Sequence, residues 1–129
     1  MKDIIEVIKS QEDLIVGKGI NENDILKAES ELGLTFSDDY RRYVKNFGCM
    51  EFDGREFTGI SKLVNYDVVS ITVSQKKYNS EIPSDWYVIE QLNIDGIVIW
   101  QSSSGEIYQT YPSTKPKKIC NSFIEYISM

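Results

Sequence analysis

Apolar residues between positions 3 and 47 recur at spacings of three and four, which is the period of an amphipathic helix. The pattern predicts three helices, over about 3–11, over 22–32 and after Ser37. The apolar stripes of the second and third helices are Ile25, Ala28 and Leu32, then Tyr40, Tyr43, Val44 and Phe47. Gly33 and Gly48 stand where these helices should end, because glycine readily adopts the left-handed turn that closes a helix. The first third of the chain is therefore predicted to be helical.

Polar residues mark where the predicted helices begin. Asn21 precedes the second helix, and Ser37 precedes the third with Asp38 and Asp39 in its first turn. Such side chains accept hydrogen bonds from the free N–H groups of a helix start, and acids there are favoured by the helix dipole. Near the end of the chain, Asn121 is predicted to cap a last helix that carries Phe123, Ile124, Tyr126 and Ile127.

The pattern changes to alternation after residue 50. Residues 51–57 alternate around Asp53-Gly54, a strong signal for a β-hairpin. Three β-rich runs follow at 86–91, 97–100 and 106–109, joined through the turns 93–96 and 102–105. Consecutive hairpin-connected strands form an antiparallel meander. The predicted fold class is therefore α+β, with an antiparallel or mixed β-sheet and α-helices packed mainly on one face.

Residues 67–79 fit two structures. Val69, Ile71 and Val73 alternate as in a strand, and their β-branched side chains favour one. The same segment also fits a helix that begins after Asp67, since aspartate is a good helix cap. Periodicity leaves both alternatives open.

Length and hydropathy narrow the class of protein. A chain of 129 residues predicts one domain over 1–129. No stretch approaches the roughly 18 apolar residues of a membrane helix, and the acids in the first apolar stretch are not typical of a signal peptide. We therefore expect a cytoplasmic protein that contacts no membrane, with Cys49 and Cys120 as reduced thiols.

The net charge of −6 is concentrated in the first half of the chain. Residues 1–60 hold thirteen acids and eight bases, and residues 61–129 hold seven acids and six bases. An acidic chain binds nucleic acid poorly, because the phosphates repel it and few counterions are released. Charge complementarity instead favours a basic protein partner, although the same charge would also serve solubility alone.

Motifs for catalysis or metal binding are absent from the sequence. The chain has no histidine, the usual base for a nucleophile and the commonest metal ligand. Cys49 follows a helix-ending glycine and is interpreted as a packing residue. The carboxylates show no spacing that sets an acid and a base at a working distance or supplies a calcium loop. We therefore predict no enzyme activity, no cofactor and no metal site.

Acidic residues also suggest a binding surface. Residues 81–106 contain five acids and no base, and the predicted hairpin adds three more acids. One hypothesis places Glu81 and Asp85 on a shared rim with Glu51, Asp53, Glu56, Glu90 and Asp95; the alternative is that these acids are scattered. Trp86 and Tyr87 would face opposite sides of a strand, so that one of them could be exposed; the alternative, which the large area of aromatic rings favours, is that both pack in the core. The candidate partner-binding residues are Glu51, Asp53, Glu56, Tyr87, Glu90 and Asp95.

The order of these pieces resembles the SUKH superfamily. The resemblance rests on Ile25, Ala28, Glu29, residues 32–34, Phe36, Asp39, Tyr40, Tyr43, Phe47, Gly48, Glu51, Phe52, Gly54, Glu56, Phe57, Gly59 and Ile60. Weaker similarity follows at 83–89, 95–96, 100, 105–108 and 122–127. Ser37 replaces a usual proline, and Gln101-Ser102 stand where many members carry an aspartate. The resemblance implies an α+β fold with a helix after the first hairpin, so it predicts that 68–78 are helical.

The resemblance also implies a function. Bacterial members of the superfamily look like immunity proteins that bind a cognate toxin domain, often a nuclease, and block it, whereas the yeast members regulate cell-wall assembly. A nuclease presents a basic cleft to its substrate, which an acidic surface could occupy. The expected function is that of an immunity protein (antitoxin) whose partner is a basic, nuclease-like toxin domain. The alternative is a regulatory adaptor that binds a scaffold.

Overall fold

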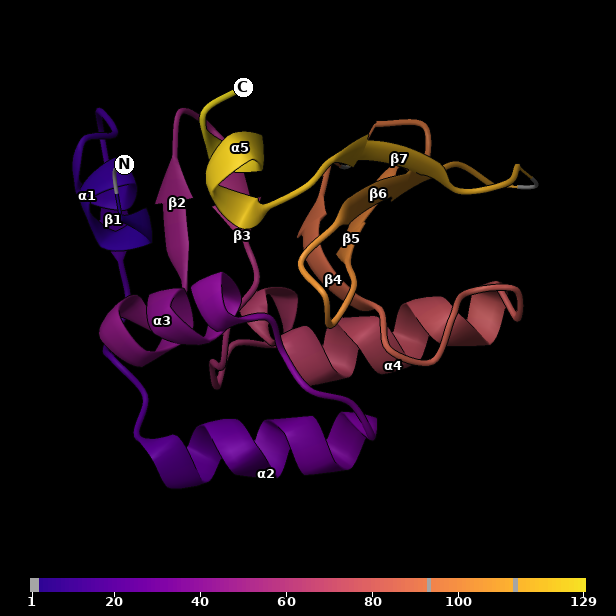
Figure 1. Cartoon of the computed structure of the whole chain (residues 1–129), viewed down its shortest axis with the longest axis horizontal. Coiled ribbons are helices and arrows are strands. Elements are labelled where there is room, and N and C mark those ends of the chain that lie inside the picture. Colours follow the sequence, from indigo (N-terminus) through magenta and orange to yellow (C-terminus); the bar gives the residue numbers. More distant parts are fainter. Residues whose placement is uncertain (1–2, 93, 113) are drawn as a thin grey trace.

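The structure is a computed structural model and describes residues 3–92, 94–112 and 114–129. Figure 1 shows helices gathered around one continuous, curved sheet. No described helix has the length and apolar character needed to cross a membrane. The elements in chain order are α1 Ile4–Lys9, β1 Ile15–Val16, α2 Glu22–Leu32, α3 Asp38–Phe47, β2 Met50–Phe52, β3 Arg55–Phe57, the 3-10 helix η1 Val64–Tyr66, α4 Val68–Tyr78, β4 Tyr87–Gln91, β5 Val98–Gln101, β6 Ile107–Thr110, β7 Lys117–Cys120 and α5 Phe123–Ile127.

The sheet has seven strands, and their order in space is their order in the chain. Every neighbouring pair is antiparallel. The predicted meander of β4, β5 and β6 continues into β7, while the predicted hairpin and the edge strand β1 join the same sheet through connections that contain helices. The α+β prediction is confirmed.

Most of the predicted helix ends are also confirmed. The side chains of Asn21 and Ser37 accept hydrogen bonds from the first turns of α2 and α3, and Gly33 closes α2 in the left-handed region at φ 68°. The prediction for the last helix was wrong by one residue. Ser122, not Asn121, caps α5, because its hydroxyl oxygen accepts the hydrogen bond from the N–H of Glu125.

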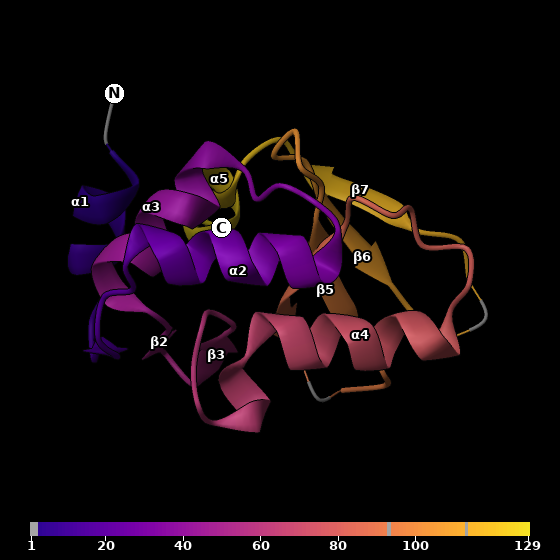
Figure 2. The same ribbon diagram turned by 90° about the horizontal axis from the view of Figure 1, so that it is seen from below.

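The ambiguous segment is helical, as the family resemblance predicted. Asp67 caps α4 by accepting a hydrogen bond from the N–H of Ser70. Val68, Ile71 and Thr72 turn toward the interior, while Val73 remains exposed. Figure 2 shows α4 lying beside α2. Tertiary packing therefore overrides the local preference for a strand.

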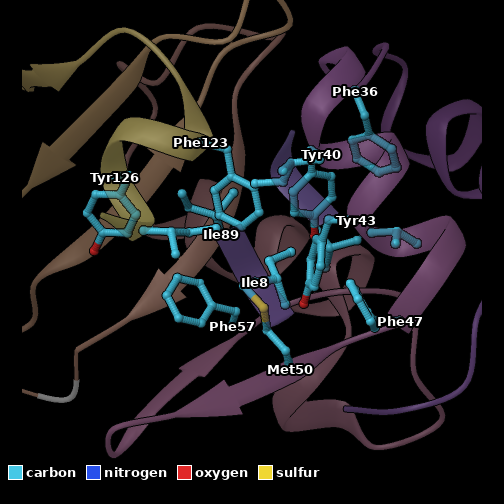
Figure 3. Packing of buried hydrophobic residues seen from close by; sticks show 14 of the residues in the cluster. Ile8, Phe36, Tyr40, Tyr43, Phe47, Met50, Phe57, Ile89, Phe123 and Tyr126 are labelled. Carbon is cyan, nitrogen blue, oxygen red and sulfur yellow. The ribbon is translucent and has the colours of Figure 1, made fainter. Parts of the chain in front are cut away.

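The main hydrophobic core lies between the sheet and the helices α1, α2, α3 and α5. Figure 3 shows its centre, where the rings of Tyr40 and Tyr43 from α3 meet Phe123 from α5 and lie near Met50 of β2. Tyr87, Ile89, Ile99 and Ile107 form the sheet's contribution from β4, β5 and β6.

A second core lies on the opposite face of the same strands. Ile71 of α4 and Ile82 pack there against Trp86, Val88, Val98 and Trp100. Trp86 also stacks on Tyr108 of β6, with ring centroids 4.1 Å apart. Because both faces of β4 and β5 are covered, neither face of these two strands is available as a bare surface.

Candidate functional site

The β2–β3 hairpin is buried on one face and open on the other. Its register sets Met50 opposite Phe57 and Glu51 opposite Glu56. Met50 and Phe57 are each 1% exposed and belong to the main core. Since successive side chains of a strand point to opposite faces, the carboxylates of Glu51 and Glu56 share the outward face. The candidate site is built on this pair.

The outward face continues across the edge strand and onto the 3-10 helix. Ile15 of β1 pairs with Glu51, so Ile15, Glu51 and Glu56 form one row across three strands. Ile15 is 62% exposed. The hydroxyl of Tyr66, from η1, donates a hydrogen bond of 3.4 Å to Glu51 Oε1.

The two carboxylates place negative charge beside a phenol. Desolvation raises the pKa of Tyr66, and the charges of Glu56 and Glu51 raise it further. Like charges directly opposite each other on neighbouring strands destabilise a sheet. Neither Glu51 nor Glu56 forms an ion pair with a described lysine or arginine. The face therefore holds unneutralised charge.

Two further candidate acids sit in turns. Asp53 and Asp95 are both exposed and both adopt positive φ, at 52° and 53°. Their chain neighbours Gly54 and Ile94 line the same hollow of about 290 Å³, between the β2–β3 hairpin and the β4–β5 turn. The fold thus places these turns at the same end of the strands. Asn93, which the sequence assigned to the second turn, lies outside the described residues.

Glu90 is not on the surface, contrary to the sequence prediction. It is 1% exposed, and it forms an ion pair with Arg55, whose Nη2 lies 3.1 Å from Glu90 Oε1. The cause is a register shift in β4, where Val88 pairs with Trp100 but Glu90 pairs with Ile99. This bulge turns Glu90 to the same side as Phe57 and Ile99, into the main core.

Arg55 completes a buried polar unit around Glu90. Its guanidinium carbon lies 4.8 Å from the ring centre of Phe57 and 5.0 Å from that of Tyr126, and the Tyr126 hydroxyl donates to Glu90. Burial by itself would lower the pKa of Arg55, but the hydrogen bond and charge of Glu90 raise it overall. The unit ties α5 to β3 and β4 and serves the fold.

Tyr87 is also buried, so the sequence prediction that it contacts a partner is withdrawn. It has no exposed surface, because the main core covers its face of β4 while the second core covers Trp86 on the other. Its hydroxyl accepts a hydrogen bond from the N–H of Ser37 (2.9 Å) and donates one to Gln101 (2.8 Å). Tyr87 therefore joins α3 to β5.

The other acids do not join one rim. Asp85 precedes β4, whereas Asp95 follows it, so the two lie at opposite ends of that strand. Asp85 accepts a hydrogen bond from the N–H of Ser103 at its own end. Glu81 lies beyond α4, beside a separate hollow. Of the seven acids considered, the structure brings together Glu51 and Glu56 on one face, with Asp53 and Asp95 in turns at one end of the strands.

The sequence analysis missed the apolar residues around this face. Leu63 and Val64, which lie three and two residues before Tyr66 in the chain, are 65% and 68% exposed. The sequence signal of this pair is weak, because Leu63-Val64 stands between Lys62 and Asn65, outside any apolar period. Tyr66 was likewise not singled out.

Three other features bear on chemistry. Among the residues that the structure describes, no three His, Cys, Asp or Glu side chains are placed to hold a metal ion. A hollow of about 620 Å³ lies between the end of α4 and the ends of β5 and β6, with Glu81 and Lys115 as its charged lining residues. The thiols of Cys49 and Cys120 are both free, and desolvation raises the pKa of each.

Together these features define a small α+β domain with a partly exposed, acidic sheet face at one end. The family model SUKH_5, described as SMI1-KNR4 cell-wall, matches residues 1–129, the whole chain. The chain therefore belongs to this SUKH family. A comparison with curated proteins finds no match.

Proposed function

We propose that this protein is an immunity protein that binds a cognate toxin domain and neutralises it by occluding the toxin's active site or substrate path. The observation that carries the proposal is the pair Glu51 and Glu56, two opposed carboxylates without a basic partner among the described residues, on the hairpin face that points away from the main core, where Glu56 is exposed and Glu51 is half-buried. A surface of this kind is complementary to a basic partner.

The proposed toxin is nuclease-like and acts in the cytoplasm. A nuclease holds the phosphates of its substrate with Arg and Lys side chains. Carboxylates that pair with those side chains would exclude the substrate from the cleft, and charge attraction would speed the encounter. The net charge of −6 disfavours direct binding of nucleic acid, so the protein itself is proposed to act through protein contact alone.

Co-expression tests the proposal. The toxin domain encoded beside this gene is expressed alone, with the wild-type protein, and with the variant Glu51→Gln/Glu56→Gln. The toxin should be lethal alone and harmless with the wild type, and the variant should protect less. A matched control, Glu12→Gln/Glu81→Gln, removes the same charge from two exposed positions elsewhere and should protect fully. Lack of rescue by the wild type, or of a complex on gel filtration, argues against the proposal.

The description of the matching family supports a second candidate function. It refers to the cell wall, and a regulatory adaptor of the cell-wall-assembly type would also act through an exposed protein-binding face. A pull-down from the native cell separates the two functions, because the immunity protein should recover a toxin and the adaptor should recover assembly or signalling proteins.

A further inference from the structure

The outward face of the hairpin has a definite composition. At its centre are the opposed carboxylates of Glu51 and Glu56, and on the β1 side is the exposed aliphatic side chain of Ile15. On the other side the Tyr66 hydroxyl reaches Glu51, and the exposed side chains of Leu63 and Val64 precede it in the chain. Exposed apolar surface thus lies beside the charge at Ile15, and the Tyr66 phenol lies beside it on η1. We call Ile15, Glu51, Glu56, Leu63, Val64 and Tyr66 the outward face.

We infer that the outward face docks an arginine-bearing surface of the partner protein, with a guanidinium between Glu51 and Glu56 and apolar neighbours against Leu63 and Val64. The inference rests on the proposed function, which it deepens by naming the chemistry of the contact. It is carried by the two opposed carboxylates together with exposed Ile15, which pairs with Glu51, and with exposed Leu63 and Val64, which lie three and two residues before the Glu51-bonded Tyr66. Exposed apolar groups rimmed by polar ones mark interaction sites.

The geometry favours arginine over lysine. Opposed residues on antiparallel strands have Cβ atoms about 5 Å apart, so one planar guanidinium can donate to both carboxylates at once. Lysine is a compact, strongly hydrated point charge and gains less from two separate acceptors. The aliphatic stem of an arginine also packs well on apolar surface, such as the side chain of Ile15.

Other occupants fit this face less well. A second copy of the chain related by a two-fold axis would set Glu51 and Glu56 against the same acids. Nucleic acid would bring phosphates to carboxylates. A metal ion would find too few ligands, since the described residues contain no group of three potential ligand side chains.

A titration with a defined probe tests the carboxylate part of the contact. The ¹⁵N-labelled protein is titrated with a capped tetra-arginine peptide and a capped tetra-lysine peptide at low ionic strength, where exposed charges are little screened. The expected result is amide shift changes concentrated at residues 15, 51, 56 and 63–66, with tighter binding of the arginine peptide. Shift changes spread evenly over the acidic surface, or centred on another face, would overturn the inference.

Matched variants sharpen this test. Glu51→Gln/Glu56→Gln should weaken binding of the arginine peptide about tenfold, whereas Glu12→Gln/Glu81→Gln, with the same charge change, should stay within about twofold. The first variant removes a like-charge contact, so its melting temperature should be unchanged or higher. Equal losses in both variants would show that only net charge matters, which contradicts a docking site.

The apolar part of the proposed contact, at Leu63 and Val64, is tested with the toxin domain itself. Leu63→Ser/Val64→Ser should weaken the complex about tenfold, whereas Leu26→Ser/Tyr78→Ser, at two other exposed positions, should not. If the complex forms and every variant binds equally, the docking inference fails while the proposed function stands. If no complex forms but the arginine peptide still binds at this face, the proposed function fails and the guanidinium site stands.

Discussion

Arg55 and Glu90 form an ion pair in which the carboxylate is almost completely enclosed, with 3.1 Å between Arg55 Nη2 and Glu90 Oε1. The pair joins β3 to β4, and the Tyr126 hydroxyl connects it to α5. A buried carboxylate that accepts three hydrogen bonds from these two residues stabilises the fold. Its burial separates it from Glu51 and Glu56, which occupy the outward face.

Replacing Glu90 should therefore damage the fold more than it damages any contact with a partner. Glu90→Gln leaves the Arg55 guanidinium without its counter-charge inside the protein. The expected loss is about 2–4 kcal/mol, toward the lower part of the range for broken buried pairs because a quarter of the Arg55 side chain is exposed. Urea unfolding measures it. The control is Glu106→Gln, which breaks a surface pair with Lys118 and should change little. Equal stability of the two variants would contradict this account.

Tyr87 should behave in the same way, with a smaller effect. Tyr87→Phe removes a hydroxyl and leaves the N–H of Ser37 and the side-chain oxygen of Gln101 short of a partner in the interior. The expected cost is about 1–3 kcal/mol in the free energy of unfolding. Binding of the toxin domain, measured by calorimetry at a temperature where the variant is folded, should keep the wild-type affinity. Weaker binding by a fully folded variant would restore Tyr87 as a contact residue.

Gly59 is required for a close approach of two backbone segments. A Cβ atom there would lie 1.7 Å from the carbonyl oxygen of Gly48. Because that oxygen belongs to the backbone, it cannot move aside as the end of a flexible side chain could. Gly59→Ala should therefore cost about 4 kcal/mol or more, or prevent folding. The control is Gly33→Ala, where positive φ is strained but no atom lies within 4 Å, so the loss should be about 1 kcal/mol. Thermal melts compare the two, and a mild effect at Gly59 would count against this backbone geometry.

The buried tyrosines should make the protein sensitive to alkali. Desolvation is the main cause that raises the pKa of Tyr40, Tyr43, Tyr87 and Tyr126 above the ordinary value of 10.0. With the folded-state pKa above the unfolded one, the unfolded chain releases protons first as pH rises. The contribution of these four tyrosines to the free energy of unfolding is thus complete below about pH 10 and is lost as the pH rises above it. Each tyrosine should contribute a slope of about 1.4 kcal/mol per pH unit.

Tyr43→Phe separates this effect from general alkaline denaturation. The variant lacks one of the four phenols, so its free energy of unfolding should fall less steeply above about pH 10, by roughly one quarter of the slope attributed to the four phenols. Its stability at neutral pH should be lower, because the hydroxyl donates to the carbonyl of Thr58 in the core. Identical slopes for the variant and the wild type would show that groups other than these tyrosines cause the loss of stability above about pH 10.

Local signals in the sequence were sufficient for much of the fold. Helix caps and glycines act within one turn, so Asn21, Ser37 and Gly33 could be recognised without knowledge of the rest of the chain. The Asp53-Gly54 turn similarly sets the register that places Glu51 opposite Glu56. Strand β7 was missed because its four residues include two lysines and have little apolar alternation. The helix α4 was predicted from the family resemblance, because its own β-branched residues favour a strand.

The sequence by itself therefore determined the α+β class, most of the helices, the acidic hairpin and the SUKH resemblance, since each depends on residues close together in the chain or on their order. Only the tertiary structure decided which candidate residues are accessible. The register shift in β4 turned Glu90 inward, and packing on both faces of that strand enclosed Tyr87 together with Trp86. Burial depends on what packs against a strand from elsewhere in the chain, and periodicity within the strand does not contain that information.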